Sequence, residues 1–77
     1  MIELKKENLE EALKISGGLI VDFWAPWCSY CRRLAPIFEK VAENYEKEFR
    51  FAKLNIDEFN HIDETYNIEV IPTLGYF

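Results

Sequence analysis

Several features that mark special classes of protein are missing from this sequence. The 77 residues include only three glycines, three prolines, two cysteines and one histidine, and they contain no repeat, no low-complexity stretch and no linker. The chain does not open with an apolar run behind basic residues, so we expect no signal peptide. The uncharged segment 15–21 is far too short to span a bilayer. We therefore expect no membrane contact.

Positive charge is scarce as well. Nine lysines and arginines stand against fourteen aspartates and glutamates, which gives a formal net charge of -5. Adjacent basic residues occur only as the pairs Lys5–Lys6 and Arg32–Arg33. Binding the phosphates of a nucleic acid requires more positive charge than this, so we expect no nucleic-acid partner. The acidic balance is typical of a soluble protein, and we expect a cytoplasmic location.

The residues that are abundant in the chain are those of a packed globular core. Hydrophobic residues make up 49% of the chain and aromatic residues 16%, which is more than a disordered segment contains. A chain of 77 residues has room for one domain. We therefore assign residues 1–77 to a single domain.

Hydrophobic periodicity predicts strands that alternate with helices. The near-continuous apolar run at 19–24 is typical of a central strand covered on both faces. Asn8 with Glu11 predicts a capping box at the first helix, and apolar residues three and four apart from Cys31 to Tyr45 predict the buried face of a longer one. Further strands are predicted at 2–4, 49–56 and 70–77, and helices near residues 8, 28 and 60. This order predicts an α/β fold with helices on both faces of a central sheet.

Cys28 and Cys31 allow three interpretations. Half of a zinc site would need two more ligands, and only His61 and weaker acidic ligands remain. Inert buried thiols would be unusual at a strand–helix junction, where side chains are commonly accessible. A redox dithiol is favoured, because Cys28 falls at or just before the first helical turn, where free amides and the helix dipole stabilise a thiolate. Cys28 would then be the nucleophile and Cys31 the resolving thiol.

Four segments of the chain resemble the thioredoxin family. Residues 21–31 read Val-Asp-Phe-Trp-Ala-Pro-Trp-Cys-Ser-Tyr-Cys, similar to the thioredoxin active-site segment, and further similarity lies at 34–36, 52–57 and 70–73. The resemblance covers essentially the whole chain. It implies a thioredoxin-like fold with a central mixed sheet, and a thiol–disulfide oxidoreductase that acts on protein substrates. It also implies a redox-active disulfide in place of any cofactor, and a thioredoxin-reductase-type electron donor.

The resemblance implies catalytic roles for four residues. Cys28 would attack a target disulfide, and Cys31 would then attack Cys28 and release the reduced target. Asp22 matches the buried acid of the family, which moves a proton to or from the resolving thiol, and burial is expected to raise its pKa. Lys53 matches the lysine close to that acid. From the residues alone, Asp22 also fits an acid at a strand edge, and Lys53 fits an ordinary surface residue.

Five further residues are expected to contact the substrate. Trp27 would shape the surface beside the nucleophile. Pro72 matches the cis-proline of the family and would let the Ile71 backbone pair with an extended substrate segment, although an ordinary proline at a strand start fits the pattern too. Ser29 and Tyr30 replace the usual glycine-proline pair. These two residues are expected to tune the reduction potential, so reductant, oxidant and isomerase roles all stay open.

Two rival functions also stay open. The tyrosine between the cysteines is similar to that of glutaredoxins, which use glutathione, although no glutathione-binding signature is present. A non-catalytic thioredoxin-like module or fragment is the other rival. Thioredoxins usually continue with another strand and a last helix beyond the position of Phe77. We therefore expect a fold truncated at its C-terminus, with an unpaired edge through which two copies could dimerise.

Overall fold

The computed structural model describes every residue from Met1 to Phe77. The strands are β1 (Ile2–Leu4), β2 (Leu19–Trp24), β3 (Arg50–Asn55) and β4 (Thr73–Tyr76). The helices are α1 (Leu9–Leu13), α2 (Ser29–Asn44) and α3 (Ile62–Thr65), and a 3₁₀ turn occupies Ile56–Glu58. The alternation of strands and helices predicted from the hydrophobic pattern is confirmed.

The strands form one mixed sheet in the order β1-β3-β2-β4. β1 and β2 run parallel to β3, whereas β4 runs antiparallel to β2. In this register Asp22 of β2 lies between Lys53 of β3 and Leu74 of β4. β2 is therefore interior to the sheet, as its apolar run predicts, because a strand with two neighbours and helices over both faces is shielded from water.

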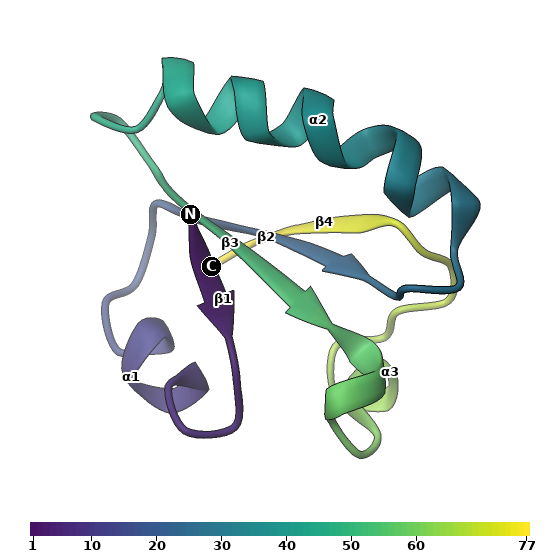
Figure 1. Cartoon of the computed structure of the whole chain (residues 1–77). Helices are drawn as coiled ribbons and strands as arrows, with labels where there is room; N and C mark the ends of the chain where they lie inside the picture. The colour runs from purple at the N-terminus through teal and green to yellow at the C-terminus, as the bar shows by residue number, and fades with distance from the viewer.

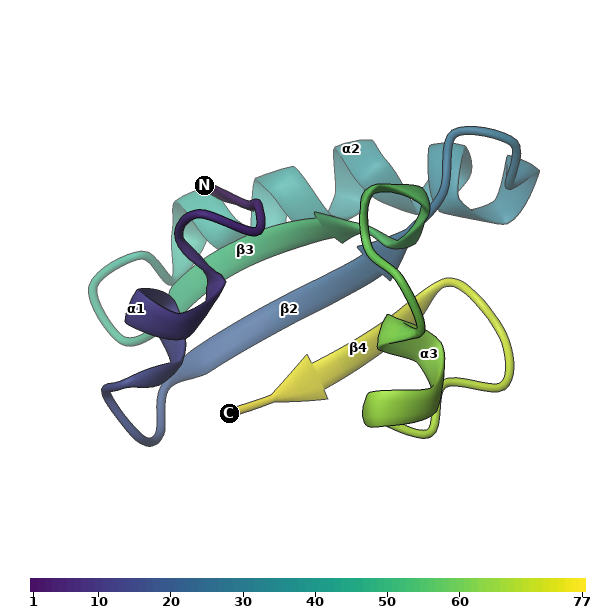
Figure 2. The same ribbon diagram turned by 90° about the horizontal axis from the view of Figure 1, so that it is seen from below.

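Helices cover both faces of this sheet. α2 lies across one face, and α1 and α3 lie on the other (Figure 1 and Figure 2). Side chains alternate along β2: Phe23 joins the main core with α1 and α3, whereas Ile20 packs against Phe38 of α2. Asp22 is two residues from Ile20 in β2, so the two side chains lie on the same face of the sheet. Its carboxyl group is thereby placed on the face that carries α2 and Cys31.

The start of α1 differs from the predicted capping box. The Asn8 side chain makes no bond to the helix that follows. Its Oδ1 instead accepts from the Lys5 backbone N–H at 2.7 Å, and its Nδ2 donates to the Glu3 carbonyl oxygen at 2.9 Å. The asparagine therefore stabilises the turn between β1 and α1, because its amide is satisfied by residues that precede it.

The buried face of α2 and the start of β4 also differ from the predictions. α2 continues through Pro36 and stops at Asn44. The predicted buried positions Val41 and Tyr45 are 40% and 52% exposed, since no other element of the chain packs over that part of the helix. β4 begins at Thr73 and not at residue 70, because the segment before it bends and its proline has no N–H to donate to a strand ladder. β4 is an edge strand, as predicted.

Candidate active site

The turn between β2 and α2 places Cys28 at the N-terminus of the long helix. Cys28 is the N-cap residue, with extended backbone angles (φ -93°, ψ 111°), and its backbone N–H donates to the Ala25 carbonyl oxygen at 3.1 Å. Its sulfur accepts a hydrogen bond from the backbone N–H of Cys31 at 3.1 Å. A thiolate at this point faces an otherwise unpaired helix amide and the positive end of the helix dipole.

The two cysteines are unequal. Both are free thiols, and Cys28 is 7% exposed whereas Cys31 is 2% exposed. Burial raises the pKa of the Cys31 thiol to about 11, with smaller increases from its hydrogen bond to Cys28 and from the charges of Cys28 and Asp22. Cys31 is therefore the more deeply buried of the two thiols. At neutral pH its thiol is protonated, and it needs a base before it can act as a nucleophile.

Asp22 lies in the interior of the sheet with no exposed surface. Neither carboxylate oxygen has a hydrogen-bond partner. Burial therefore raises the pKa of this carboxyl group, and the positive charge of Lys53 opposes part of that rise. The predicted direction of the shift agrees with the structure. An acid with an elevated pKa, next to a buried thiol, is suited to accept and return a proton.

Lys53 is close enough to influence Asp22 but forms no ion pair with it. The two residues are paired in the β2–β3 register, yet the ammonium group lies over the indole ring of Trp24, 4.8 Å from its centroid. A cation gains electrostatic energy over an aromatic face, which draws this flexible side chain toward Trp24 at the carboxyl end of β2. The lysine thus lies near the acid, as the resemblance implies, without a direct ion pair between them.

The segment before β4 crosses directly beside the cysteines. The Ile71–Pro72 peptide bond is cis, as the resemblance implies. The Cys28 thiol donates to the Ile71 carbonyl oxygen at 3.7 Å, and Ile71 packs against the small cluster formed by Cys28, Cys31 and Ala25. Two segments far apart in the sequence therefore meet at Cys28.

Exposed aromatic side chains surround this point. Trp27 is 66% exposed and Tyr30 is 67% exposed, and the guanidinium of Arg33 lies 5.5 Å from the centroid of the Tyr30 ring. Ser29 is also exposed, in the first turn of α2. Large apolar groups exposed together commonly mark a contact surface for another molecule.

Two residues of this region were not singled out from the sequence. The indole Nε1 of Trp27 donates to Asp57 Oδ2 at 3.1 Å and to Oδ1 at 3.3 Å. Val70, directly before Ile71, is highly exposed beside the cysteine site. The sequence position of Asp57 could have indicated its nearness to the cysteines. Asp57 follows the carboxyl end of β3, and in a parallel pair this end lies next to the carboxyl end of β2.

Comparison with known proteins identifies the family. The family model described as Thioredoxin matches residues 1–77. The chain belongs to the thioredoxin family. A thioredoxin of Rickettsia bellii is 46% identical over 68 residues, which cover 88% of this chain and 65% of that protein. A thioredoxin of Pseudomonas aeruginosa is 40% identical over 68 residues, which cover 88% of this chain and 63% of that protein.

The matched region thus spans slightly less than two thirds of the length of these thioredoxins. Family membership and the mixed α/β fold agree with the resemblance found in the sequence. No group of three or more histidine, cysteine, aspartate or glutamate side chains is arranged to hold a metal ion, and His61 is an exposed residue beside Glu64. None of the helices combines the length and the apolar character needed to cross a bilayer.

Proposed function

We propose that this chain carries the active site of a thiol–disulfide oxidoreductase that exchanges disulfides with protein substrates. The observation that supports the proposal is the hydrogen bond from the Cys31 amide to the Cys28 sulfur at the start of α2. This contact stabilises negative charge on Cys28 and sets the second sulfur on the same helical turn. Cys28 is the attacking thiolate, and Cys31 is the resolving thiol.

The reaction we propose has two exchanges. The Cys28 thiolate attacks one sulfur of the target disulfide, the target S–S bond breaks, and a mixed disulfide forms as the first target thiolate leaves. Cys31 then loses its proton and attacks the Cys28 sulfur. The Cys28–Cys31 disulfide forms, and the second target thiolate leaves. The target has gained two electrons, and the cysteine pair has lost them.

Asp22 is the base we propose for the second exchange. The Cys31 thiol has its pKa raised to about 11, so it carries almost no thiolate at neutral pH. The buried carboxyl group of Asp22 interacts electrostatically with it and has no competing hydrogen-bond partner. Proton transfer works best when the acid and the base are not far apart in pKa. Burial raises the pKa of Asp22, which brings it closer to the pKa of Cys31 and so favours the proton transfer.

Substrate would bind across the two segments that meet at Cys28. The exposed aromatic rings of Trp27 and Tyr30 would offer apolar contact on one side, and the segment at Val70 and Ile71, where Val70 is exposed and the Ile71 carbonyl oxygen faces Cys28, would offer backbone pairing for an extended peptide on the other. A protein substrate covers both surfaces at once. Ser29 and Tyr30 would contact it and set the reduction potential.

The cycle requires an external reductant. The Cys28–Cys31 disulfide left by each turnover must receive two electrons and two protons, and we propose a thioredoxin-reductase-type donor and no bound cofactor. A cytoplasmic location is part of this proposal, because that compartment keeps thiols reduced.

Insulin reduction with dithiothreitol as electron source tests the proposal. We expect turnover by the 77-residue chain, loss of turnover in Cys28→Ser, and a trapped mixed disulfide in Cys31→Ser. The matched control is Ser16→Ala, which removes an exposed hydroxyl in the loop before β2, at the end of that strand away from the cysteines, and should retain turnover. A folded chain without activity, checked by circular dichroism, would support a non-catalytic module. Turnover with glutathione but not with a thioredoxin reductase would support the glutaredoxin-like rival.

A further inference from the structure

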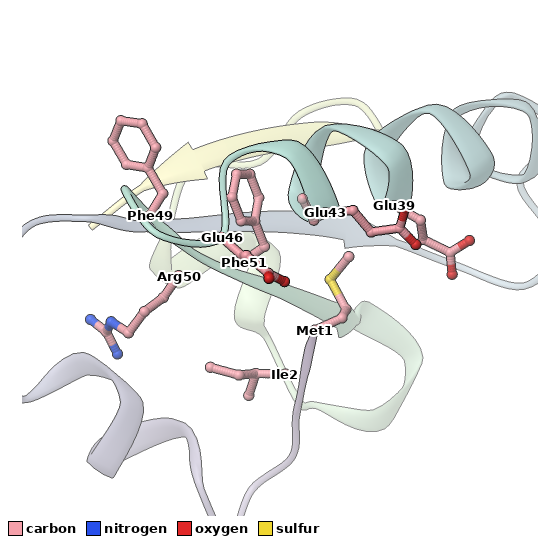
Figure 3. Close-up of a pocket in the computed structure, with 9 residues that line it drawn as sticks. Met1, Ile2, Glu39, Glu43, Glu46, Phe49, Arg50 and Phe51 are labelled. Carbon is pink, nitrogen blue, oxygen red and sulfur yellow. The ribbon is translucent and has the colours of Figure 1, made fainter.

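A large pocket of the molecule lies away from the cysteines. It has a volume of about 540 Å³ and opens between the C-terminal half of α2 and the starts of β1 and β3 (Figure 3). Its lining residues are Met1, Ile2, Glu39, Ala42, Glu43, Glu46, Phe49, Arg50 and Phe51. At 1.5 Å of rise per residue, Glu43 lies roughly 20 Å along α2 from Cys28. The proposed redox chemistry makes no use of this part of the molecule.

The floor of the pocket is apolar. Phe51 and Ala42 are buried and form its base with Ile2. The ring of Phe51 is held between two aromatic neighbours: its centroid lies 5.8 Å from that of Phe38 and 6.3 Å from that of Phe49. A fixed aromatic floor of this kind can accept an apolar side chain without rearranging.

One wall of the pocket is acidic. Glu39 and Glu43 are exposed four residues apart on one side of α2, and Glu46 is exposed in the turn just after the helix; all three line the pocket. None of them takes part in an ion pair. Like charges at this spacing repel one another, and a cation bound between them would relieve that repulsion.

The basic residue that lines the pocket does not neutralise this wall. The guanidinium of Arg50 donates from Nη1 to the Ala12 carbonyl oxygen at 3.1 Å and from Nη2 to the Ile15 carbonyl oxygen at 3.2 Å. Figure 3 shows its side chain directed toward α1 and away from the glutamates. The three carboxylates therefore remain available to a positively charged partner.

We propose that this groove, defined by the nine lining residues, binds a segment of another protein in which an apolar side chain is flanked by lysine or arginine. The apolar side chain would lie on Phe51 and Ala42, and the flanking cations would meet Glu39, Glu43 and Glu46. The glutamates, Met1 and Phe49 leave the rim open to solvent, which suits a macromolecular segment better than an enclosed small ligand. A second copy is disfavoured because each chain carries a net charge of -5.

A synthetic probe tests the proposal directly. A short fluorescein-labelled peptide of alternating lysine and leucine would be titrated into the 77-residue chain by fluorescence anisotropy, and its site mapped by amide chemical shifts in NMR. We expect saturable binding, with shifts at Glu43, Glu46, Phe49 and Phe51 and none at Trp27. We also expect weaker binding at higher ionic strength. A peptide with glutamate for lysine, or with serine for leucine, should not bind.

Matched variants distinguish binding of the probe in this groove from non-specific attraction of a basic peptide to an acidic protein. Glu39→Gln, Glu43→Gln and Glu46→Gln together should weaken probe binding by roughly five- to thirtyfold. The control changes three exposed α1-side acids, Glu7→Gln, Glu10→Gln and Glu11→Gln, and alters the net charge equally but should leave binding unchanged. No probe binding, an equal loss in both triple variants, or shifts confined to the cysteine site would overturn the proposal. Insulin reduction is measured in parallel and should be unaffected by either triple variant.

Discussion

Replacing Asp22 should make the protein more stable while it slows disulfide exchange. The carboxyl group is fully buried, and neither of its oxygens has a hydrogen-bond partner. A buried polar group in this condition costs about 1–3 kcal/mol, and a charged one costs at least as much. Asp22→Ala removes that cost and leaves only a small void. We therefore expect the free energy of unfolding to rise by about 1–3 kcal/mol at neutral pH.

The size of this effect should depend on pH. Burial raises the pKa of Asp22 above its ordinary value. At a pH between the pKa of the unfolded chain and that of the folded protein, the native state therefore holds a proton on Asp22 that the unfolded chain has lost. Stability then falls as pH rises through that window, and the cost is complete above the folded pKa. Below about pH 4 the carboxyl group is protonated in both states, and the charge-related part of the advantage of Asp22→Ala should vanish.

Thermal and urea unfolding across a pH series measure this prediction. For a chain of this size a gain of 1 kcal/mol raises Tm by about 4–8 °C, so Asp22→Ala should gain about 5–20 °C at neutral pH. Asp22→Asn should also flatten the pH dependence, with a smaller gain because its amide stays unpaired. The exposed Asp63→Ala is the control and should shift stability by less than about 1 kcal/mol. A gain that is independent of pH, or larger in acid, would refute the reasoning.

Three further predictions follow from the site and the core. Iodoacetamide should alkylate Cys28 much faster than Cys31 at neutral pH, and the Cys31 rate should rise about tenfold per pH unit up to about 11, as its raised pKa requires; equal rates by mass spectrometry would contradict this. Lys53→Met should raise the pKa of Asp22 further, because Lys53 lowers it; a carboxyl titration by NMR that is unmoved or moves down would count against the electrostatic link. Leu54→Ala, at a fully buried position, should lower the free energy of unfolding by about 2–5 kcal/mol in urea; a loss below 1 kcal/mol would show that this site repacks freely.

The part of the fold that could be predicted from sequence is the part that local pattern determines. β2 is recognisable because a strand buried on both faces must be apolar at nearly every position, and only Asp22 departs from that rule. Cys28 could be placed at a helix start because the apolar spacing changes from continuous to three and four just after it. Asparagine tolerates a left-handed backbone better than most residues, and Asn67 adopts one, with φ of 55°.

The parts that sequence could not provide depend on which segments meet. Asn8 has good capping chemistry, but its amide is closer to the backbone of Glu3 and Lys5, and spacing alone cannot choose between these partners. The contact of Trp27 with Asp57 joins residues that follow two neighbouring strands, and strand order is a tertiary property. Lys53 illustrates the same limit, because the competing attraction of the Trp24 ring is visible only once the sheet is formed.

The pKa of Cys31 should depend on whether the Cys28 sulfur is free, which would link the ionisation of Cys31 to the second exchange of the proposed reaction. Two of the causes that raise the pKa of Cys31, its hydrogen bond to Cys28 and the charge of Cys28, exist only while the Cys28 sulfur is free. Once that sulfur is bonded to a target, both disappear, and only burial and the charge of Asp22 keep the Cys31 pKa high. The resolving thiol should therefore become easier to ionise at the step where it is needed.

A chain alkylated only at Cys28 mimics that step without allowing resolution. Its Cys31 thiol, titrated by the ultraviolet absorbance of the thiolate, should ionise with a pKa below the value of about 11 found when Cys28 is free. Asp22→Asn in the same alkylated chain should lower the pKa again, because it removes the remaining negative charge. If alkylation leaves the Cys31 titration unchanged, burial alone holds the resolving thiol protonated, and its activation has to come entirely from proton transfer to Asp22.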